Sequence, residues 1–256
     1  MKKLPLFIVI MLIYSSNADG QKMMKLDDEL KTYSQPMEAK RKGISTVGKY
    51  EFGPYKIVSG KAGWTITKSK ERFVLVNSFK APIFNLDYNT ESKNKSSFVF
   101  IANDKDTLLV NLTTNSKASE TYIGPLSWLN QSNENYITMI SPVADTSKWV
   151  MILNTNSGAK VEGNYTAEGV LTDGVTNIEI REVKQWEDGK SPAFGMICGY
   201  EFYVDNHSIA AVQSCLDTTK KKFVWLYPDL DEKIKSVIAA ASASLMVHTD
   251  EMMASQ

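Results

Sequence analysis

The segment Val237-Ile-Ala-Ala-Ala-Ser-Ala-Ser-Leu-Met-Val247 is long enough for about three helical turns and contains no charged residue. A helix that is apolar or small on every side has to be enclosed, either by protein or by lipid. The segment is shorter than the ~20 residues that a helix needs to cross a bilayer. It is therefore predicted to be a helix enclosed by the protein's own chain.

The residues before this segment predict where the helix begins. Pro228 ends a β-rich run, and Asp229 can then cap the helix start. Glu232 lies three residues after Asp229, which is an aspartate version of the capping box. The predicted helix covers residues 229–247.

Upstream of the helix, from about Ile44, short β-rich runs follow one another with turn sequences between them. Closely spaced strands without helical crossovers indicate a meandering antiparallel sheet. About a dozen such runs can close into a barrel whose lumen admits a helix ~10 Å across. The expected fold class is mainly β: an antiparallel, closed or nearly closed barrel of about 12 strands with a buried hydrophobic C-terminal helix. The alternative is an open sheet or sandwich with the helix on one face.

The segment FVWLYPDLDEKIKSVIAAA, residues 223–241, resembles the C-terminus of phospholipid scramblases and LURP-one-related proteins, which belong to the tubby-like superfamily. The similarity lies in the strand ending at Pro228, the Asp229-Leu230-Asp231 sequence, the lysines at 233 and 235, and the small-residue helix. It covers about the last 60 residues. The resemblance implies a twelve-stranded barrel around a C-terminal helix, and it transfers no functional residue to this chain.

The N-terminus has the pattern of an export signal. Lys2 and Lys3 precede an apolar run, residues 4–14, and small residues follow at Ser16 and Ala18. Cleavage is predicted after Ala18, which makes residues 1–18 a signal peptide and the mature protein periplasmic or extracellular. The expected organisation continues with a polar arm or linker over 19–43 and a single β-rich domain over 44–256. No transmembrane segment is expected in the mature chain.

The charges of the chain balance, with 29 lysines and arginines against 29 aspartates and glutamates. A neutral chain does not create the field that attracts nucleic acid, so a nucleic-acid partner is not expected. The only basic clusters are Lys40-Arg41-Lys42 and Lys220-Lys221-Lys222. A basic groove near the second cluster would favour a lipid headgroup as ligand.

Two cysteines in an exported chain suggest one disulfide. Residues 194–204 and 208–215 resemble two strands of a hairpin around Asp205-Asn206-His207-Ser208. Either a two-residue or a four-residue loop places Cys198 opposite Cys215, a geometry that suits a disulfide. The alternative is a pair of buried reduced thiols.

The sequence contains no catalytic signature, no metal-binding pattern and no cofactor motif. His207, in the predicted turn, and His248 have no second ligand at metal spacing. Two carboxylates from any part of the fold can form a glycosidase-type site. The candidates are Glu162, Glu168, Glu179, Glu182, Glu187 and Asp188. Trp128 and Trp149 flank polar turns, where they could line a carbohydrate or headgroup site, although strand tryptophans more often pack in a core.

The sequence thus favours an exported, non-catalytic binding or scaffold protein, with a lipid headgroup or a glycan as ligand only by analogy. One alternative is a secreted hydrolase that uses a carboxylate pair in a β-sheet cleft. Another is a protein-binding component of an envelope assembly. The sequence does not indicate the oligomeric state.

Overall fold

The computed structural model describes residues 22–43, 47–63, 65–78, 81–123, 126–158, 166–192, 196–215 and 221–254. The predicted export signal and its cleavage position at Ala18 lie outside these residues. The strands are β1 (Met37–Lys42), β2 (Lys49–Phe52), β3 (Tyr55–Ala62), β4 (Ile66–Ser78), β5 (Ala81–Ala102), β6 (Asp106–Ile123), β7 (Leu126–Pro142), β8 (Trp149–Gly158), β9 (Thr166–Thr172), β10 (Asn177–Val183), β11 (Gly199–Val204), β12 (His207–Gln213) and β13 (Lys222–Leu226). The helices are α2 (Asp28–Tyr33) and α3 (Glu232–Ala254).

The strands form one antiparallel barrel, which confirms the predicted fold class. β5 to β13 follow each other around the sheet, β13 pairs with β1, and the pairing of β3 with β5 closes a ring of twelve strands. β4 lies outside the ring, because it pairs only with β5. It joins β5 at residues 81–93, beyond the segment 96–102 that β3 occupies on the same edge. β4 therefore continues the line of β3 past the end of the barrel.

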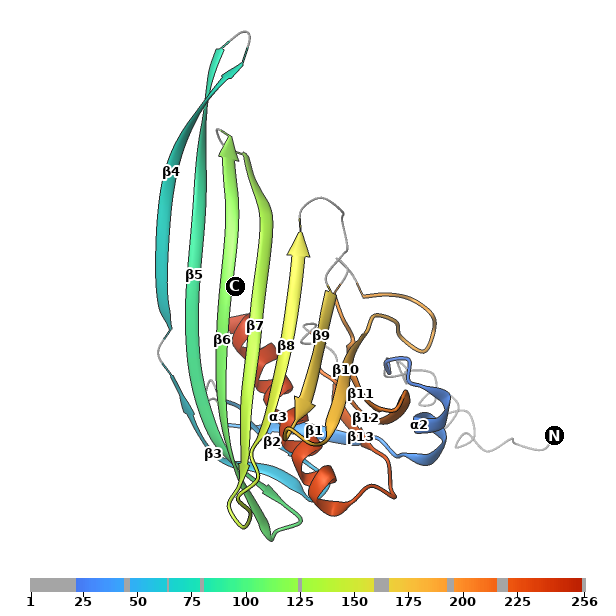
Figure 1. Ribbon diagram of the computed structural model, residues 1–256. Coiled ribbons are helices and arrows are strands. Elements are labelled where there is room, and N and C mark those ends of the chain that lie inside the picture. The colour runs from blue at the N-terminus through green and yellow to red at the C-terminus, as the bar shows by residue number, and fades with distance from the viewer. Residues whose placement is uncertain are drawn as a thin grey trace, which may run out of the picture.

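Helix α3 runs inside the barrel (Figure 1). Every residue from Ser236 to Asp250 is buried, and the apolar ones belong to the main core with the inward side chains of the strands. Tyr136 on β7 donates its hydroxyl to the main-chain oxygen of Ser244 over 2.7 Å, which fixes the helix to the wall. Each fully buried leucine, isoleucine or valine of the helix contributes about 1.5–3 kcal/mol to stability. The helix therefore supplies a large share of the core.

The ends of α3 differ from the prediction of 229–247. The helix begins at Glu232, and the side chain of Asp231, rather than that of Asp229, accepts hydrogen bonds from the first-turn amides of Lys233 and Ile234. It continues to Ala254, past the end of the apolar run. Among the described residues, no helix is long and apolar enough to cross a membrane.

The polar arm or linker predicted for residues 19–43 is wrong for its second half, because Met37–Lys42 is the barrel strand β1. This strand pairs with β13 on one side and β2 on the other. The residues before it form a second, smaller core on the outside of the barrel. There Met24 and Leu30 pack against the outward side chains of β12 and β13, among them Trp225.

The predicted disulfide between Cys198 and Cys215 is also wrong: both cysteines are buried and not bonded. The hairpin has the expected two strands, but it turns at Asp205-Asn206, and a bulge between Phe202 and Tyr203 shifts the register. The amide of Ser214 consequently donates to the carbonyl oxygen of Cys198, over 3.1 Å. Cys215 lies one residue beyond the position that faces Cys198, so the geometry needed for the bond is lost.

On one side of the barrel the strands extend far beyond the end of the enclosed helix. β4, β5, β6 and β7 rise well beyond the C-terminal end of α3 (Figure 1). The inward face of these strands is apolar beside the helix, as at Phe98 and Leu112, and becomes polar above it, as at Asn94 and Thr114. The polar part of the sheet therefore forms one wall of the barrel mouth.

Candidate binding site at the barrel mouth

The last turns of α3 divide the mouth of the barrel into two hollows. His248, Glu251 and Met252 share one face of the helix, whereas Asp250 and Met253 lie on the opposite face. The first face borders a hollow of about 460 Å³, the acidic hollow, which is lined by Ser92, Asn94, Thr114, Glu134, His248 and Glu251. The second borders a hollow of about 440 Å³, the basic hollow, which is lined by Lys40, Arg41, Tyr50, Lys221, Lys222 and Asp250.

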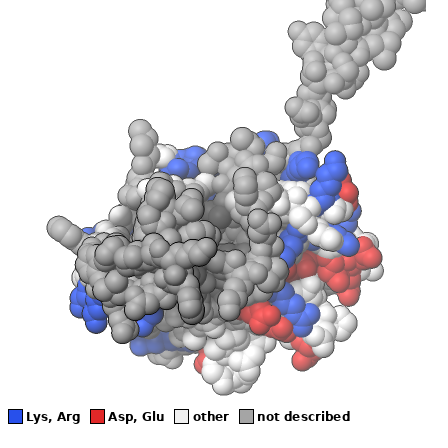
Figure 2. Space-filling view, turned by 90° about the horizontal axis from the view of Figure 1, so that it is seen from above, with Lys and Arg blue, Asp and Glu red and all other residues white. Residues whose placement is uncertain are grey.

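The basic hollow exists because the fold joins the two basic clusters of the sequence. Antiparallel pairing of β1 with β13 sets Ala39 opposite Lys222, so that residues 40–42 continue past the start of β13. Lys42, opposite Lys49 on β2, forms an ion pair with Glu51 and does not line the hollow. Viewed from above, lysine and arginine side chains occupy several places around the molecule (Figure 2). Lys220 lies outside the described residues.

Asp250 is the centre of a buried network in the basic hollow. Its carboxylate lies 2.6 Å from the amino group of Lys222, with side chains only 8% and 12% exposed. It also accepts a hydrogen bond from the Tyr50 hydroxyl over 2.6 Å and lies 3.2 Å from Nε of Arg41. The amino group of Lys222 donates in addition to the carbonyl oxygen of Met246, over 3.2 Å. The network therefore ties the end of α3 to β1, β2 and β13.

Burial dominates the electrostatics of this network. It lowers the pKa of Lys222, and the neighbouring carboxylate of Asp250 only partly opposes that effect. Burial, together with Asp250, raises the pKa of Tyr50, so the phenol stays protonated. Four cationic side chains and two acidic ones, Glu38 and Asp250, line the hollow. The hollow therefore keeps an excess of positive charge.

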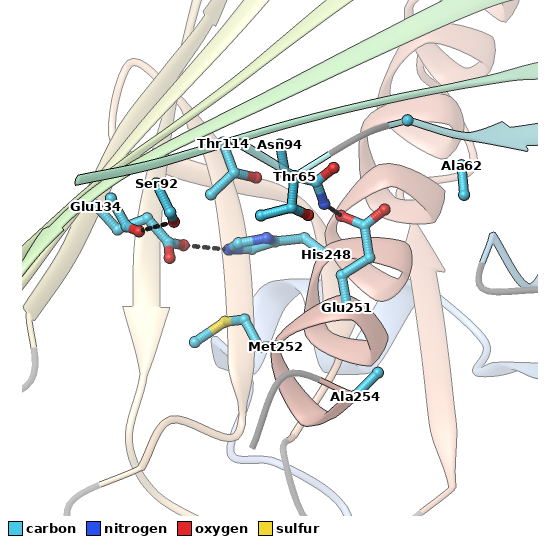
Figure 3. Close-up of a pocket in the computed structure, with 12 residues that line it drawn as sticks. Ala62, Thr65, Ser92, Asn94, Thr114, Glu134, His248, Glu251, Met252 and Ala254 are labelled. Atoms are coloured by element: carbon cyan, nitrogen blue, oxygen red, sulfur yellow. Dashed lines mark hydrogen bonds and ion pairs between the residues drawn. The ribbon is translucent and has the colours of Figure 1, made fainter. Parts of the chain in front are cut away.

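The acidic hollow lies under the polar part of β5, β6 and β7 (Figure 3). His248 is 4% exposed, and its ring stacks on that of Tyr136 with centroids 4.1 Å apart. Nε2 of His248 lies 2.7 Å from Oε1 of Glu134, yet neither atom makes a hydrogen bond of good geometry. The imidazole is thus held by stacking and by its contact with the carboxylate of Glu134, and both contacting atoms are buried.

Glu251 approaches the same hollow from the next turn of α3. Removal from water raises the pKa of its carboxyl group, and the nearby carboxylates of Asp250 and Glu134 act in the same direction. The side-chain amide of Asn94 donates to Glu251 over 3.4 Å. In the described part of the chain, no group of three or more His, Cys, Asp and Glu side chains is arranged to hold a metal ion.

Comparison of the chain with protein families, with curated proteins and with solved structures finds no match. The resemblance of the C-terminal segment to the tubby-like superfamily stays a prediction. The two hollows therefore have to be interpreted from their own chemistry.

The structure does not bring together the carboxylates that the sequence suggested. Three of them and Asp188 form separate ion pairs near the surface: Glu179 with Arg181, Glu182 with Lys184, Glu187 with Lys31, and Asp188 with Lys22. Glu168 lies on β9, opposite Asn154 and Arg181, and Glu162 lies outside the described residues.

Of the aromatic and histidine candidates, His248 lies at the mouth, whereas Trp149 and His207 do not. Trp149 is 1% exposed and belongs to the core, so it does not line a ligand site. Trp128 lies on β7, and its side chain lies outside the described residues. His207 is exposed at the hairpin turn, 3.5 Å from Glu29.

The residues at the mouth were missed because their partners are distant in sequence. One signal was available: His248, Asp250 and Glu251 directly follow an apolar run that was already predicted to be buried. Charged groups at the end of a buried helix require partners. That rule predicts that partners exist, but it does not identify Lys222, Glu134 or Asn94.

Proposed function

We propose that this chain is an exported, non-catalytic binding protein whose basic hollow holds an anionic group, of the phosphate type, from a lipid headgroup or a soluble phosphate ester. The supporting observation is that Lys40 and Arg41 meet Lys221 and Lys222, which are far away in sequence, around one hollow. Lysine and arginine are the side chains that bind phosphate oxygens best. A glycan stays the alternative ligand, and export stays a prediction from the N-terminal sequence.

The arrangement favours binding over a purely structural role for these cations. Four cationic side chains line the hollow with only two carboxylates, whereas Lys42 lies outside it and pairs with Glu51. Lys40 is exposed beside Arg41, and Lys221 is paired only at the surface, with Glu38. An anion in the hollow would reduce the repulsion among these groups.

Binding of defined probes tests the proposal. The mature protein is titrated calorimetrically with inorganic phosphate. It is also sedimented with vesicles of phosphatidylcholine that contain or lack phosphatidylglycerol. Binding to phosphate and to the anionic vesicles indicates a lipid headgroup, whereas binding to phosphate alone indicates a soluble ester. No binding to either, or equal binding to pure phosphatidylcholine vesicles, would refute the proposal.

Two exposed lysines allow a specific control. The double variant Lys40→Gln/Lys221→Gln is expected to bind the anionic vesicles roughly 30-fold more weakly, at about 1 kcal/mol for each lysine. Lys105→Gln removes an equally exposed lysine from the turn between β5 and β6 and is expected to bind like the unchanged protein. Higher salt should weaken binding, because screening acts on exposed charges.

A second candidate function is the secreted hydrolase, because the acidic hollow does contain two carboxyl groups, those of Glu134 and Glu251. A carboxyl group with a raised pKa can act as a general acid beside an ionised one. Turnover of a panel of aryl glycosides, lost in both Glu134→Gln and Glu251→Gln, would support this function. Absence of turnover would contradict this function.

A further inference from the structure

The part of the sheet that rises above the barrel mouth has two chemically different faces. Successive residues of a strand point to opposite faces, and paired residues of neighbouring strands share a face. Among the described side chains, the inner face of three strands carries only hydroxyl and amide groups, and we call it the hydroxyl wall. Its members are Thr67 and Ser69 on β4, Thr90, Ser92 and Asn94 on β5, and Thr114 and Ser116 on β6.

The outer face of the same three strands is charged. Lys68 lies directly opposite Glu91, and Lys117 forms an ion pair with Glu91 over 3.1 Å. The charged residues described on this face are Lys68, Lys70, Glu91, Lys93, Lys95 and Lys117. No member of the hydroxyl wall is buried, so both faces contact water. Solubility alone does not explain why charges occur on one wet face and not on the other.

The hydroxyl wall borders an open hollow. The hollow of about 460 Å³ above the end of α3 is lined on its strand side by Ser92, Asn94, Thr114 and Ser116 (Figure 3). The strands β4 to β7 continue well beyond the end of α3 (Figure 1). A ligand that begins in the acidic hollow can therefore extend out of it along the strands.

The hydroxyl wall is a regular array of groups that both donate and accept hydrogen bonds. Neighbouring strands lie ~4.8 Å apart, and alternate residues of one strand lie ~6.8 Å apart. The hydroxyl groups of Ser92 and Ser116 are 2.6 Å from each other. Each hydroxyl has one hydrogen and two lone pairs, so this pair keeps one hydrogen and further lone pairs for a ligand. The amide of Asn94 donates to Glu251 over 3.4 Å and keeps its carbonyl oxygen as an acceptor.

We infer that the hydroxyl wall binds a neutral polysaccharide, which lies along β4 to β6 with one end in the acidic hollow. Sugar hydroxyls donate and accept hydrogen bonds as the wall does, and an uncharged ligand needs no counter-ion on it. The nearest carboxylate on the sheet, that of Glu134, is already in contact with His248. The hydroxyl wall is separate from the basic hollow, so the inference goes beyond the proposed anion site and does not depend on it.

Native affinity electrophoresis tests the inference. The mature protein is run through gels that contain hydroxyethylcellulose, dextran or soluble starch, which are neutral polymers with different linkages. Polygalacturonate serves as the anionic comparison. At least one neutral polymer is expected to retard the protein, and the dependence of mobility on polymer concentration gives the dissociation constant. Retardation by none of the neutral polymers, or by polygalacturonate alone, overturns the inference.

Adjacent positions of β6 provide a matched pair of variants. Thr114→Val/Ser116→Ala removes two hydroxyl groups from the wall and is expected to bind the retarding polymer roughly 10-fold more weakly, as the loss of two hydrogen bonds predicts. Thr113→Val/Asn115→Ala makes similar changes on the outer face of the same strand and is expected to bind like the unchanged protein. Unchanged binding in the first variant, or equal weakening in both, overturns the inference.

A variant on β4 leaves the closed ring of the barrel intact. Thr67→Lys places a long charged side chain at an exposed wall position and is expected to weaken polysaccharide binding at least 10-fold, whereas Lys68→Gln on the outer face is expected to have no effect. Unchanged binding in Thr67→Lys overturns the inference. The Lys40→Gln/Lys221→Gln variant separates the two proposals, because it should lose binding of anionic vesicles and keep its retardation by the neutral polymer.

Discussion

Replacement of Asp250 by asparagine tests the network that joins α3 to the barrel wall. The substitution preserves the size of the side chain and removes one charge, and it leaves Lys222 buried at 12% exposure without its counter-ion. Breaking a buried ion pair by removing one partner costs about 3–5 kcal/mol. Lys222 can also lose its proton instead of staying buried as an unpaired charge. With a free pKa of about 10.4, that deprotonation costs about 4.6 kcal/mol at pH 7, so the loss of unfolding free energy cannot exceed this amount. The expected loss of unfolding free energy is therefore about 3–4.6 kcal/mol.

Urea unfolding, followed by tryptophan fluorescence and by circular dichroism, measures this loss. The midpoint is expected to fall with an unchanged slope, and the melting temperature is expected to fall by roughly 6–18 °C for a domain of this size. The double variant Lys222→Met/Asp250→Leu removes both charges and is the matched control. It is expected to lie within about 1.5 kcal/mol of the unchanged protein, because an ion pair replaced by apolar groups is often neutral. Arg41 is 42% exposed, so its guanidinium group can be hydrated in the double variant, where it has lost its partner Asp250.

Two results would show that this reasoning is wrong. A loss below about 1 kcal/mol in Asp250→Asn would mean that the network behaves like an ordinary surface pair. A double variant as unstable as the single one would mean that the shape of the site, rather than its charge, determines the cost.

Three further predictions concern the helix, the acidic hollow and the cysteines. Leu245→Ala removes a fully buried side chain of α3 and should lower the unfolding free energy by about 2–5 kcal/mol in urea, whereas a loss under 1 kcal/mol would contradict the enclosed helix. Burial raises the pKa of Glu251 in the folded state. At pH values between the unfolded pKa of 4.5 and the folded pKa, the folded protein therefore binds more protons than the unfolded chain. Stability from this group is present below pH 4.5 and is lost as pH rises through the folded pKa. Glu251→Gln should therefore be more stable than the unchanged protein at pH 7 and lose that advantage near pH 4; a constant difference across this range would contradict the assignment. Cys198 and Cys215 should react with Ellman's reagent only after unfolding, because both are buried and burial raises the pKa of Cys198 to about 12; mass mapping that finds them joined would contradict the hairpin register.

The barrel with its enclosed helix was predictable because both signals are local. Residues 237–247 are apolar or small on every side, which only an enclosed position explains. β10 shows the other signal, since its buried and exposed residues alternate over Asn177–Ile180 as a strand with one wet face requires. Such patterns specify which elements form, but they contain little information on which elements become neighbours.

The failed predictions each depend on one feature that has no local signature. The hairpin turns at Asp205-Asn206, one residue earlier than predicted, which moves Cys215 out of register with Cys198, and the bulge between Phe202 and Tyr203 only partly restores the register. β1, with the sequence Met-Glu-Ala-Lys-Arg-Lys, is polar and at most partly buried, so it resembles a linker although the barrel needs it next to β13. A strand held mainly by backbone pairing does not need an apolar pattern.

The same strand pairing explains why the barrel mouth carries local charge although the chain as a whole is neutral. A chain with no net charge still contains a basic and an acidic hollow, because α3 emerges between β1 and β13 on one side and β5 to β7 on the other. Its helical period directs Asp250 to the first side, and His248 and Glu251 to the second. A ligand in either hollow would contact the helix that fills the core, and because it binds only the folded protein it would raise the stability of the barrel by RT ln(1 + [L]/Kd). Site and core are therefore coupled through one helix, and a probe that binds either hollow should raise the unfolding midpoint.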